Sequence, residues 1–242
     1  MDAAEQAYFR NAFKSGVRHR GDMHYEPLRV TLHLGAPVAL THPWVYLDSI
    51  IKHLMLVNAL EDNFYLLPAK FPMGKILGHG GSLPIKHTSG LAHSSASIFE
   101  IKKDGMETIY KRFEDRWAGG RRKINIGSGH FRNYMMSTVY VSAPTCEFYV
   151  FGDKKLLSKI LDSLVGIGDN TRIGWGHVRS FEIEQQQEDW SIIKDGRAMR
   201  PIPKKMLTSS SEYLRMAWRS PYWAADSVDV CAPPGAEVEL RG

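Results

Sequence analysis

The stretch that decides the fold is Gly166-Ile167-Gly168-Asp169-Asn170-Thr171-Arg172-Ile173-Gly174-Trp175-Gly176-His177-Val178, which holds four glycines within eleven residues. Glycine allows a backbone to approach a bulky anion and to present its N–H groups. Lys154–Val165, just before it, has the apolar spacing of a helix with Asp153 as the expected N-cap. Val178–Ile183, just after it, alternates as a strand does. The stretch therefore predicts a glycine loop between a helix and a strand.

This order excludes two nucleotide-binding motifs. A dinucleotide fingerprint needs a strand before the glycines and a helix after them, and a P-loop needs Gly-Lys-Ser/Thr, which is absent. Two interpretations remain open on spacing alone: a loop that cradles a sugar-phosphate backbone, and a tight turn that packs on a sheet without a ligand. The first makes candidate RNA-binding residues of Gly166, Gly168, Arg172, Gly174, Trp175, Gly176, His177 and Arg179.

The rest of the chain extends this unit into a fold. Pro27–Leu34 alternates as a half-buried strand, and Tyr46–Asn58 has a helical apolar face. Tyr134–Ala143 and Glu147–Phe151 are predicted to form a β-hairpin across the Pro144-Thr145 turn. Without the less regular residues 61–135, the order is β-α-β-β-α-β. We therefore expect an α+β fold with a ferredoxin-like (RRM-like) core and a long inserted thumb or lobe.

Three regions follow from this reading. Residues 1–26 are expected to be an N-terminal helical segment, and residues 27–195 an RRM-like domain with the insertion 61–135. Residues 196–242 are expected to be a C-terminal tail. It is rich in proline, and little order is expected beyond about Ser227.

Composition indicates the cellular compartment and limits the classes of partner that we expect. A net charge of +5 fits a polyanion without requiring one. Two cysteines outside any CxxC pair argue for a reducing compartment. The most apolar segment, Val45–Leu60, is interrupted by charged residues, and the first residues are acidic where a signal peptide would be basic. We expect a cytoplasmic protein with no membrane partner.

The run Lys111–Arg132 has a local excess of positive charge. Its cations outnumber Glu114 and Asp115 by five, which equals the excess of the whole chain, and aromatic residues lie between them. Cations meet phosphates while rings stack on unpaired bases, so the run predicts nucleic-acid binding. The alternative is a solvated basic surface. The candidates here are Lys111, Arg112, Arg116, Arg121, Arg122, Lys123, His130 and Arg132.

The histidines provide only weak catalytic signals. None of the ten shows HxxxH or HExxH spacing, so neither a metal nor another cofactor is expected. A histidine can remove the proton of an RNA 2′-hydroxyl, which makes His33, His87 or His130 a candidate general base. Surface or hydrogen-bonded histidines are the alternative. Gly90–Ser95 lacks the pattern of a nucleophile elbow.

Three segments resemble a known family. Leu164-Val165-Gly166-Ile167-Gly168 with Gly174-Trp175-Gly176-His177-Val178 resembles the G-loop of RAMP proteins, the RRM-like subunits of CRISPR effector complexes. Pro27–Leu34 followed by Pro43–Ile51 is similar to the start of a first RAMP domain. Leu83–Ala96 is similar to a segment of the small backbone subunit of type IV systems, and it adds Lys86 and His87 to the RNA-binding candidates. The resemblance covers about residues 27–185.

The resemblance implies a non-catalytic subunit of a ribonucleoprotein. In that family the subunit caps the 5′ handle of the guide RNA (crRNA) through its core and a thumb hairpin, and Lys111–Arg132 lies where a thumb would be. The implied partners are crRNA, the large subunit and the repeated backbone subunit, with the target DNA duplex as a further neighbour. One alternative is the metal-independent endoribonuclease of the same superfamily, which processes precursor crRNA. Another is a protein-interaction module whose basic patch meets an acidic partner.

Overall fold

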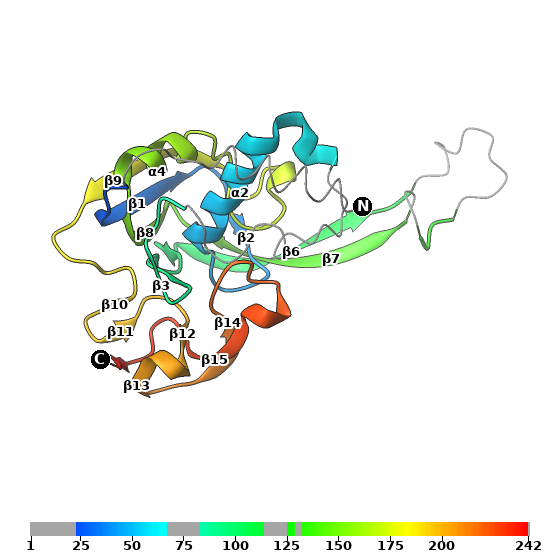
Figure 1. The fold of residues 1–242 in the computed structure, drawn as a ribbon. Helices are drawn as coiled ribbons and strands as arrows, with labels where there is room; N and C mark the ends of the chain where they lie inside the picture. Colours follow the sequence, from blue (N-terminus) through cyan, green and yellow to red (C-terminus); the bar gives the residue numbers. More distant parts are fainter. Residues whose placement is uncertain (1–22, 67–82, 114–124, 129–131, 242) are drawn as a thin grey trace, which may run out of the picture.

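The computed structural model describes residues 23–66, 83–113, 125–128 and 132–241. Its central sheet has the strand order β5-β8-β1-β9, with every pair antiparallel. Two α-helices of the described chain, α2 (Leu47–Leu60) and α4 (Lys154–Leu161), pack together beside this sheet (Figure 1). The predicted α+β class is confirmed. The four strands are β1 (Glu26–Leu34), β5 (Ile98–Phe99), β8 (Thr145–Gly152) and β9 (Val178–Gln185).

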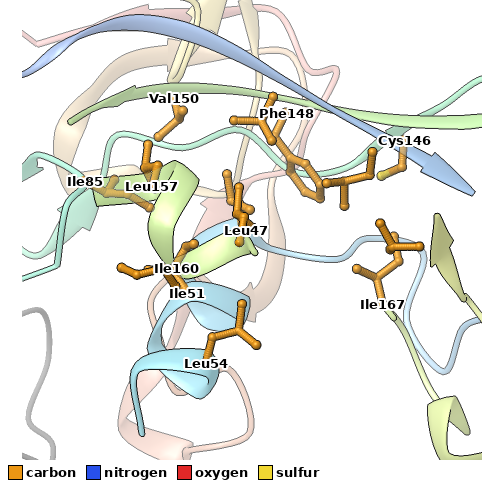
Figure 2. Packing of buried hydrophobic residues seen from close by; sticks show 14 of the residues in the cluster. Leu47, Ile51, Leu54, Ile85, Cys146, Phe148, Val150, Leu157, Ile160 and Ile167 are labelled. Atoms are coloured by element: carbon orange, nitrogen blue, oxygen red, sulfur yellow. The ribbon is translucent and has the colours of Figure 1, made fainter. Parts of the chain in front are cut away.

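The core lies between the sheet and the two helices. Leu28, Val30 and Leu32 of β1 are buried on one face, as their alternation predicts. Figure 2 shows side chains of β8, α2 and α4 converging in this layer, including Phe148, Ile51 and Leu157. Asp153 caps α4 as predicted, because its carboxylate accepts a hydrogen bond from the N–H of Leu156 at 3.1 Å. This core fixes the positions of the loops at both ends of the sheet.

A long hairpin projects from the body (Figure 1). It consists of β6 (Lys103–Lys111) and β7 (Tyr134–Ser142), paired from Lys103↔Ser142 to Lys111↔Tyr134. The short strand β2 (Val38–Ala39) pairs with β7 at the base.

The predicted hairpin of Tyr134–Ala143 with Glu147–Phe151 was wrong, because β7 pairs with β6 and β2 while β8 lies in the central sheet. Alternation identifies a strand and its buried face, but it does not identify the neighbouring strand. The chain leaves one sheet for the other near Pro144, whose carbonyl accepts from the N–H of Leu34 at the end of β1.

Short elements complete the body. The small hairpin of β3 (His87–Thr88) and β4 (Leu91–Ala92) turns through Ser89 and Gly90, both with positive φ. The 3-10 turns are η1 (Glu61–Leu66), η3 (Thr171–Ile173), η4 (Lys204–Met206) and η5 (Ala225–Ser227). None of the helices within the described ranges has the length and apolarity needed to cross a membrane.

The C-terminal residues are folded, so the expectation of little order beyond about Ser227 was wrong. Strands β15 and β16 lie in this segment and pair with β12, β14 and β13. Each strand is short and buries only a few side chains, such as Ile202 and Ala232, which is why the sequence pattern is weak. The strands are β10 (Ile193–Lys194), β11 (Arg197–Ala198), β12 (Ile202–Pro203), β13 (Leu207–Ser210), β14 (Leu214–Ala217), β15 (Val228–Ala232) and β16 (Val238–Leu240).

The expected N-terminal helical segment, residues 1–26, falls almost entirely outside the described residues.

Candidate nucleic-acid interface

The glycine loop, residues 166–178, packs against β2. The N–H of Asp169 donates to the carbonyl of Ala39 at 2.8 Å, and the N–H of Gly176 donates to the carbonyl of Pro37 at 2.7 Å. The carboxylate of Asp169 also accepts from the backbone N–H of Thr41 at 2.7 Å and from its hydroxyl at 2.5 Å. The loop is therefore held to the segment that forms the base of the projecting hairpin.

Two glycines of the loop are required by this packing. Gly176 has φ +63°, and a Cβ atom there would lie 1.9 Å from the carbonyl oxygen of Ile167. Gly168 has φ +78°, and its Cβ atom would lie 2.5 Å from the carbonyl oxygen of Ala39. Since no side chain fits at such distances, the tight-turn interpretation accounts for these two positions without a ligand.

A groove of about 340 Å³ lies between the glycine loop and the hairpin. One wall is η3 and the residue before it, and the other is the face of β6 and β7 where Ile109 and Met136 oppose each other. Trp175 contacts Tyr140 of the same hairpin face, with ring centroids 5.5 Å apart. The groove thus lies between the glycine loop and the two strands that flank the basic run Lys111–Arg132. Its lining residues are Ile109, Tyr134, Met136, Asn170, Thr171, Arg172 and Ile173.

Cations occupy the distal end of the hairpin. Lys111, Arg112 and Arg132 are exposed there, and Lys111 opposes Tyr134 across the two strands. The N–H of Phe113 donates to the side-chain carbonyl of Asn133 at 2.7 Å, which extends the pairing beyond β6. The remaining candidates of the basic run, Arg116, Arg121, Arg122, Lys123 and His130, lie outside the described residues.

His177 and Arg179 do not line the groove. They flank Gly35 at the end of β1, where a Cβ atom would lie 2.9 Å from each side chain. The imidazole of His177 also lies 3.2 Å from the carbonyl oxygen of Val165. The predicted RNA-binding role of His177 and Arg179 stays a prediction.

Lys86 and His87 lie at the far end of the sheet from the glycine loop. The N–H of Lys86 donates to the carbonyl of Phe151, near one end of β8. At the other end of β8, Thr145 pairs with His33, which lies beside the glycine loop. Phe151 and Thr145 are six residues apart along the strand, which corresponds to about 20 Å. Burial lowers the pKa of His87, which favours its neutral form. As RNA-binding residues both stay predictions.

The open face of the central sheet is rich in carboxylates. Arg29 is hydrogen-bonded to Glu184, which raises its pKa, and it lies 3.9 Å from Glu147. His33 lies 3.2 Å from Glu182. A phosphate backbone on this face would meet the carboxylates of three glutamates, so the charges of this face disfavour a polyanion.

Sequence reasoning missed a polar cluster at the far end of the sheet. The hydroxyl of Thr88 lies 2.8 Å from Nε2 of His93, whose Nδ1 lies 3.3 Å from a carboxylate oxygen of Asp189. Asp189 is 96 residues from His93, so no local motif marks the set. Among the described residues, no three side chains of His, Cys, Asp or Glu gather as metal ligands.

A family model matches residues 86–233, more than half of the chain. The protein is therefore a CRISPR-associated protein of the type IV class, and the predicted resemblance to a type IV CRISPR protein is confirmed. It belongs to the family described as CRISPR type IV associated protein Csf3.

Two further similarities are more distant. A tropinone reductase homolog of Arabidopsis thaliana is 26% identical over 117 residues, so the chain spans only 40% of the length of that curated relative. The described strands of this chain pair antiparallel and its glycine loop follows a helix, which differs from the parallel strand-glycine turn-helix unit of a dinucleotide-binding motif. Among solved structures, the type III-B Cmr-beta bound to cognate target RNA is 10% identical with a TM-score of 0.40, covering 76% of this chain and 67% of that chain.

Proposed function

We propose that this chain is an RNA-binding subunit of a type IV CRISPR effector complex and that it holds the 5′ handle of crRNA between the glycine loop and the β6–β7 hairpin. The main observation that supports this proposal is the groove of about 340 Å³ that lies between the glycine loop and the hairpin. Membership of the Csf3 family supports the assignment to a CRISPR effector subunit.

The groove has the chemistry of a single-strand site. Tyr134 is 44% exposed and offers a ring on which a base can stack, while Arg172 is an exposed cation on the opposite wall. Lys111, Arg112 and Arg132 at the distal end are placed to meet the phosphates that follow. Stacking together with cations is the usual mode of binding single-stranded RNA.

The core supports the same proposal. We propose that β1-α2-β5-β8-α4-β9 is a ferredoxin-like core, because its β-α-β-β-α-β order is accompanied by the sheet order β5-β8-β1-β9. The hairpin would then be the thumb of a domain over residues 27–195, and residues 196–242 would form a C-terminal region that packs on this domain. The large subunit, the repeated backbone subunit and the target DNA duplex are the proposed neighbours, in the cytoplasm.

The test is RNA binding measured as a function of salt. Fluorescence anisotropy with a labelled CRISPR repeat RNA should give a steep loss of affinity as salt rises. The variant Arg172→Ala should weaken binding about tenfold, because one charge-assisted contact is lost. Arg172→Ala combined with Arg132→Ala should flatten the salt slope by about 0.7 for each cation removed.

Arg197→Ala is the matched control. Arg197 is also exposed, but it is paired with Glu237 at 2.9 Å in the C-terminal region. This variant should bind RNA like the wild type. Absence of binding at low salt, or equal losses in Arg172→Ala and Arg197→Ala, would refute the proposed groove.

A further inference from the structure

Strand β9 forms an open edge of the central sheet. It pairs with β1 on one side, and no described strand pairs with its other side (Figure 1). The start of this second side is covered, because the N–H of Val178 donates to the carbonyl of Val165 at 2.9 Å. Residues 180–185 lie beyond that contact. An edge strand of this kind offers its backbone N–H and C=O groups to another strand.

The direction of the backbone groups along β9 follows from one hydrogen bond. The N–H of Gln186 donates to the carbonyl of Pro27 at 2.8 Å, so the backbone of Gln186 faces β1. Consecutive residues of an antiparallel strand direct these groups to opposite sides. The backbones of Glu182 and Glu184 therefore face β1 as well. The backbones that face outward are those of Phe181, Ile183 and Gln185.

One face of this edge is acidic. The side chains of Glu182 and Glu184 lie on the open face of the sheet and are 63% and 51% exposed. Glu184 and Glu147 flank Arg29, and Glu182 lies 3.2 Å from His33. Three glutamates beside one arginine leave an excess of negative charge along the edge, which favours a cationic partner.

The opposite face of β9 is apolar. Phe181 and Ile183 alternate with the glutamates and pack against the core, on the side of the sheet where α4 lies next to β9. Val165, at the end of the open edge, is 72% exposed. A strand added beside β9 would therefore extend this apolar layer with every second side chain.

We propose that the open edge of β9 binds an extended segment of a partner protein in which lysine or arginine alternates with apolar residues. In an antiparallel pairing, the apolar residues lie opposite Phe181 and Ile183 and exchange backbone hydrogen bonds with them. The cations lie opposite Glu182 and Glu184, where the strands are closest and opposite charges attract. The backbone bonds provide affinity, and the alternating charges provide specificity.

Two other occupants fit this edge less well. Two copies of the chain paired antiparallel about Glu182 or Ile183 would place glutamates directly opposite each other, which is destabilising. RNA would bring its phosphates to the same carboxylates. The inference does not rest on the proposed RNA site, whose lining residues lie outside β9, so the two proposals can fail independently.

The experiment measures the binding of labelled peptides to the purified full chain by fluorescence anisotropy. The probe is a short peptide of alternating lysine and valine, and the control peptide has glutamate in place of lysine. We expect the lysine peptide to bind at least about tenfold more tightly. N-methylation of its valines, whose amides face β9, should abolish binding. N-methylation of its lysines, whose amides face away, should leave the affinity unchanged.

Variants of the chain test the charges of the edge. Glu182→Gln combined with Glu184→Gln should weaken binding of the lysine peptide about fivefold, because two pairs of opposite charge are lost. The matched control is Glu237→Gln combined with Glu239→Gln, which removes two exposed carboxylates at the same spacing in the C-terminal region. This control should bind the peptide like the wild type.

Amide hydrogen exchange followed by NMR locates the peptide. Exchange at Phe181 and Ile183 should slow when the lysine peptide binds. Equal affinity for the two peptides, binding that survives N-methylation of the valines, or unchanged exchange at these two amides would each overturn the proposal. A wild-type dimer that dissociates in Gln185→Pro, which removes one outward N–H, would assign the edge to a second copy of the chain and would also overturn it.

Discussion

At the scale of single residues, Gly176 shows why the loop is rich in glycine. Its positive φ and the nearby carbonyl of Ile167 leave no volume for a side chain. Gly174 is different, because it also has a positive φ, of +95°, but no atom lies within 4 Å of its would-be Cβ. A side chain at Gly174 would therefore meet only the energetic cost of the left-handed backbone, whereas a side chain at Gly176 would meet this cost and a steric overlap.

We expect Gly176→Ala to destabilise the protein more than Gly174→Ala. The left-handed conformation costs about 1–2 kcal/mol for an alanine at either position. Only Gly176→Ala adds an overlap with the Ile167 carbonyl, which has to be relieved by opening the loop. Urea unfolding of both variants measures the difference. Equal losses would show that the loop tolerates a side chain at Gly176.

The sequence left the role of these glycines open for a physical reason. Spacing shows that glycine recurs, but the dihedral angles and the approach of Ile167 and Ala39 depend on the folded chain. The same limit applies to His93, whose partner Asp189 is distant in sequence. Asp153 was predictable, because a cap acts on the backbone three residues away.

At the scale of elements, β2 connects the two walls of the groove. Val38 and Ala39 pair with β7, while Ala39 also forms a bridge with Asp169 of the glycine loop. Thr41, just after β2, donates two hydrogen bonds to the Asp169 carboxylate. A short strand thus sets the position of the loop relative to the hairpin.

We expect Thr41→Ala to weaken RNA binding about fivefold. The variant removes one hydrogen bond to Asp169, worth about 1 kcal/mol, and leaves every charge in place. The effect arises because the loop wall loses part of its fixed position. Anisotropy with the labelled repeat RNA measures it. The control is Thr208→Ala, which removes an exposed hydroxyl 3.3 Å from the carbonyl oxygen of Leu240, in the C-terminal region. A Thr41→Ala protein that binds RNA as tightly as Thr208→Ala would contradict the role of β2.

Strands and helices with a continuous buried face were predictable from sequence. β1 and α4 were found within a few residues of their bounds, because their apolar periodicity reflects the same core. β5 was missed as a core strand because Ile98–Phe99 is too short to show a period. The partner of β7 was mistaken because pairing depends on contacts far along the chain.

At the scale of the whole molecule, the C-terminal region is joined to the core by Arg200. This side chain is fully buried, and its guanidinium donates to the carbonyls of Ala92, Ser94 and Trp218. It also donates to the hydroxyl of Tyr222, which donates in turn to Asp48 of α2. The burial of Arg200 could not be predicted from the sequence, because an arginine in a proline-rich tail is expected to lie on the surface.

We expect Arg200→Leu to lower the free energy of unfolding by about 3–5 kcal/mol, because buried carbonyls and the Asp48 carboxylate lose a charged partner. Arg197→Leu provides the comparison, since its exposed ion pair with Glu237 contributes at most about 1 kcal/mol. Urea unfolding followed by fluorescence measures the stability of both variants. The loss of stability in Arg200→Leu should affect the entire chain rather than the C-terminal region alone. The reason is that the guanidinium bonds directly to Ala92 of β4 and, through Tyr222, to Asp48 of α2. Two separate transitions in the wild type would show instead that residues 196–242 unfold independently of the core.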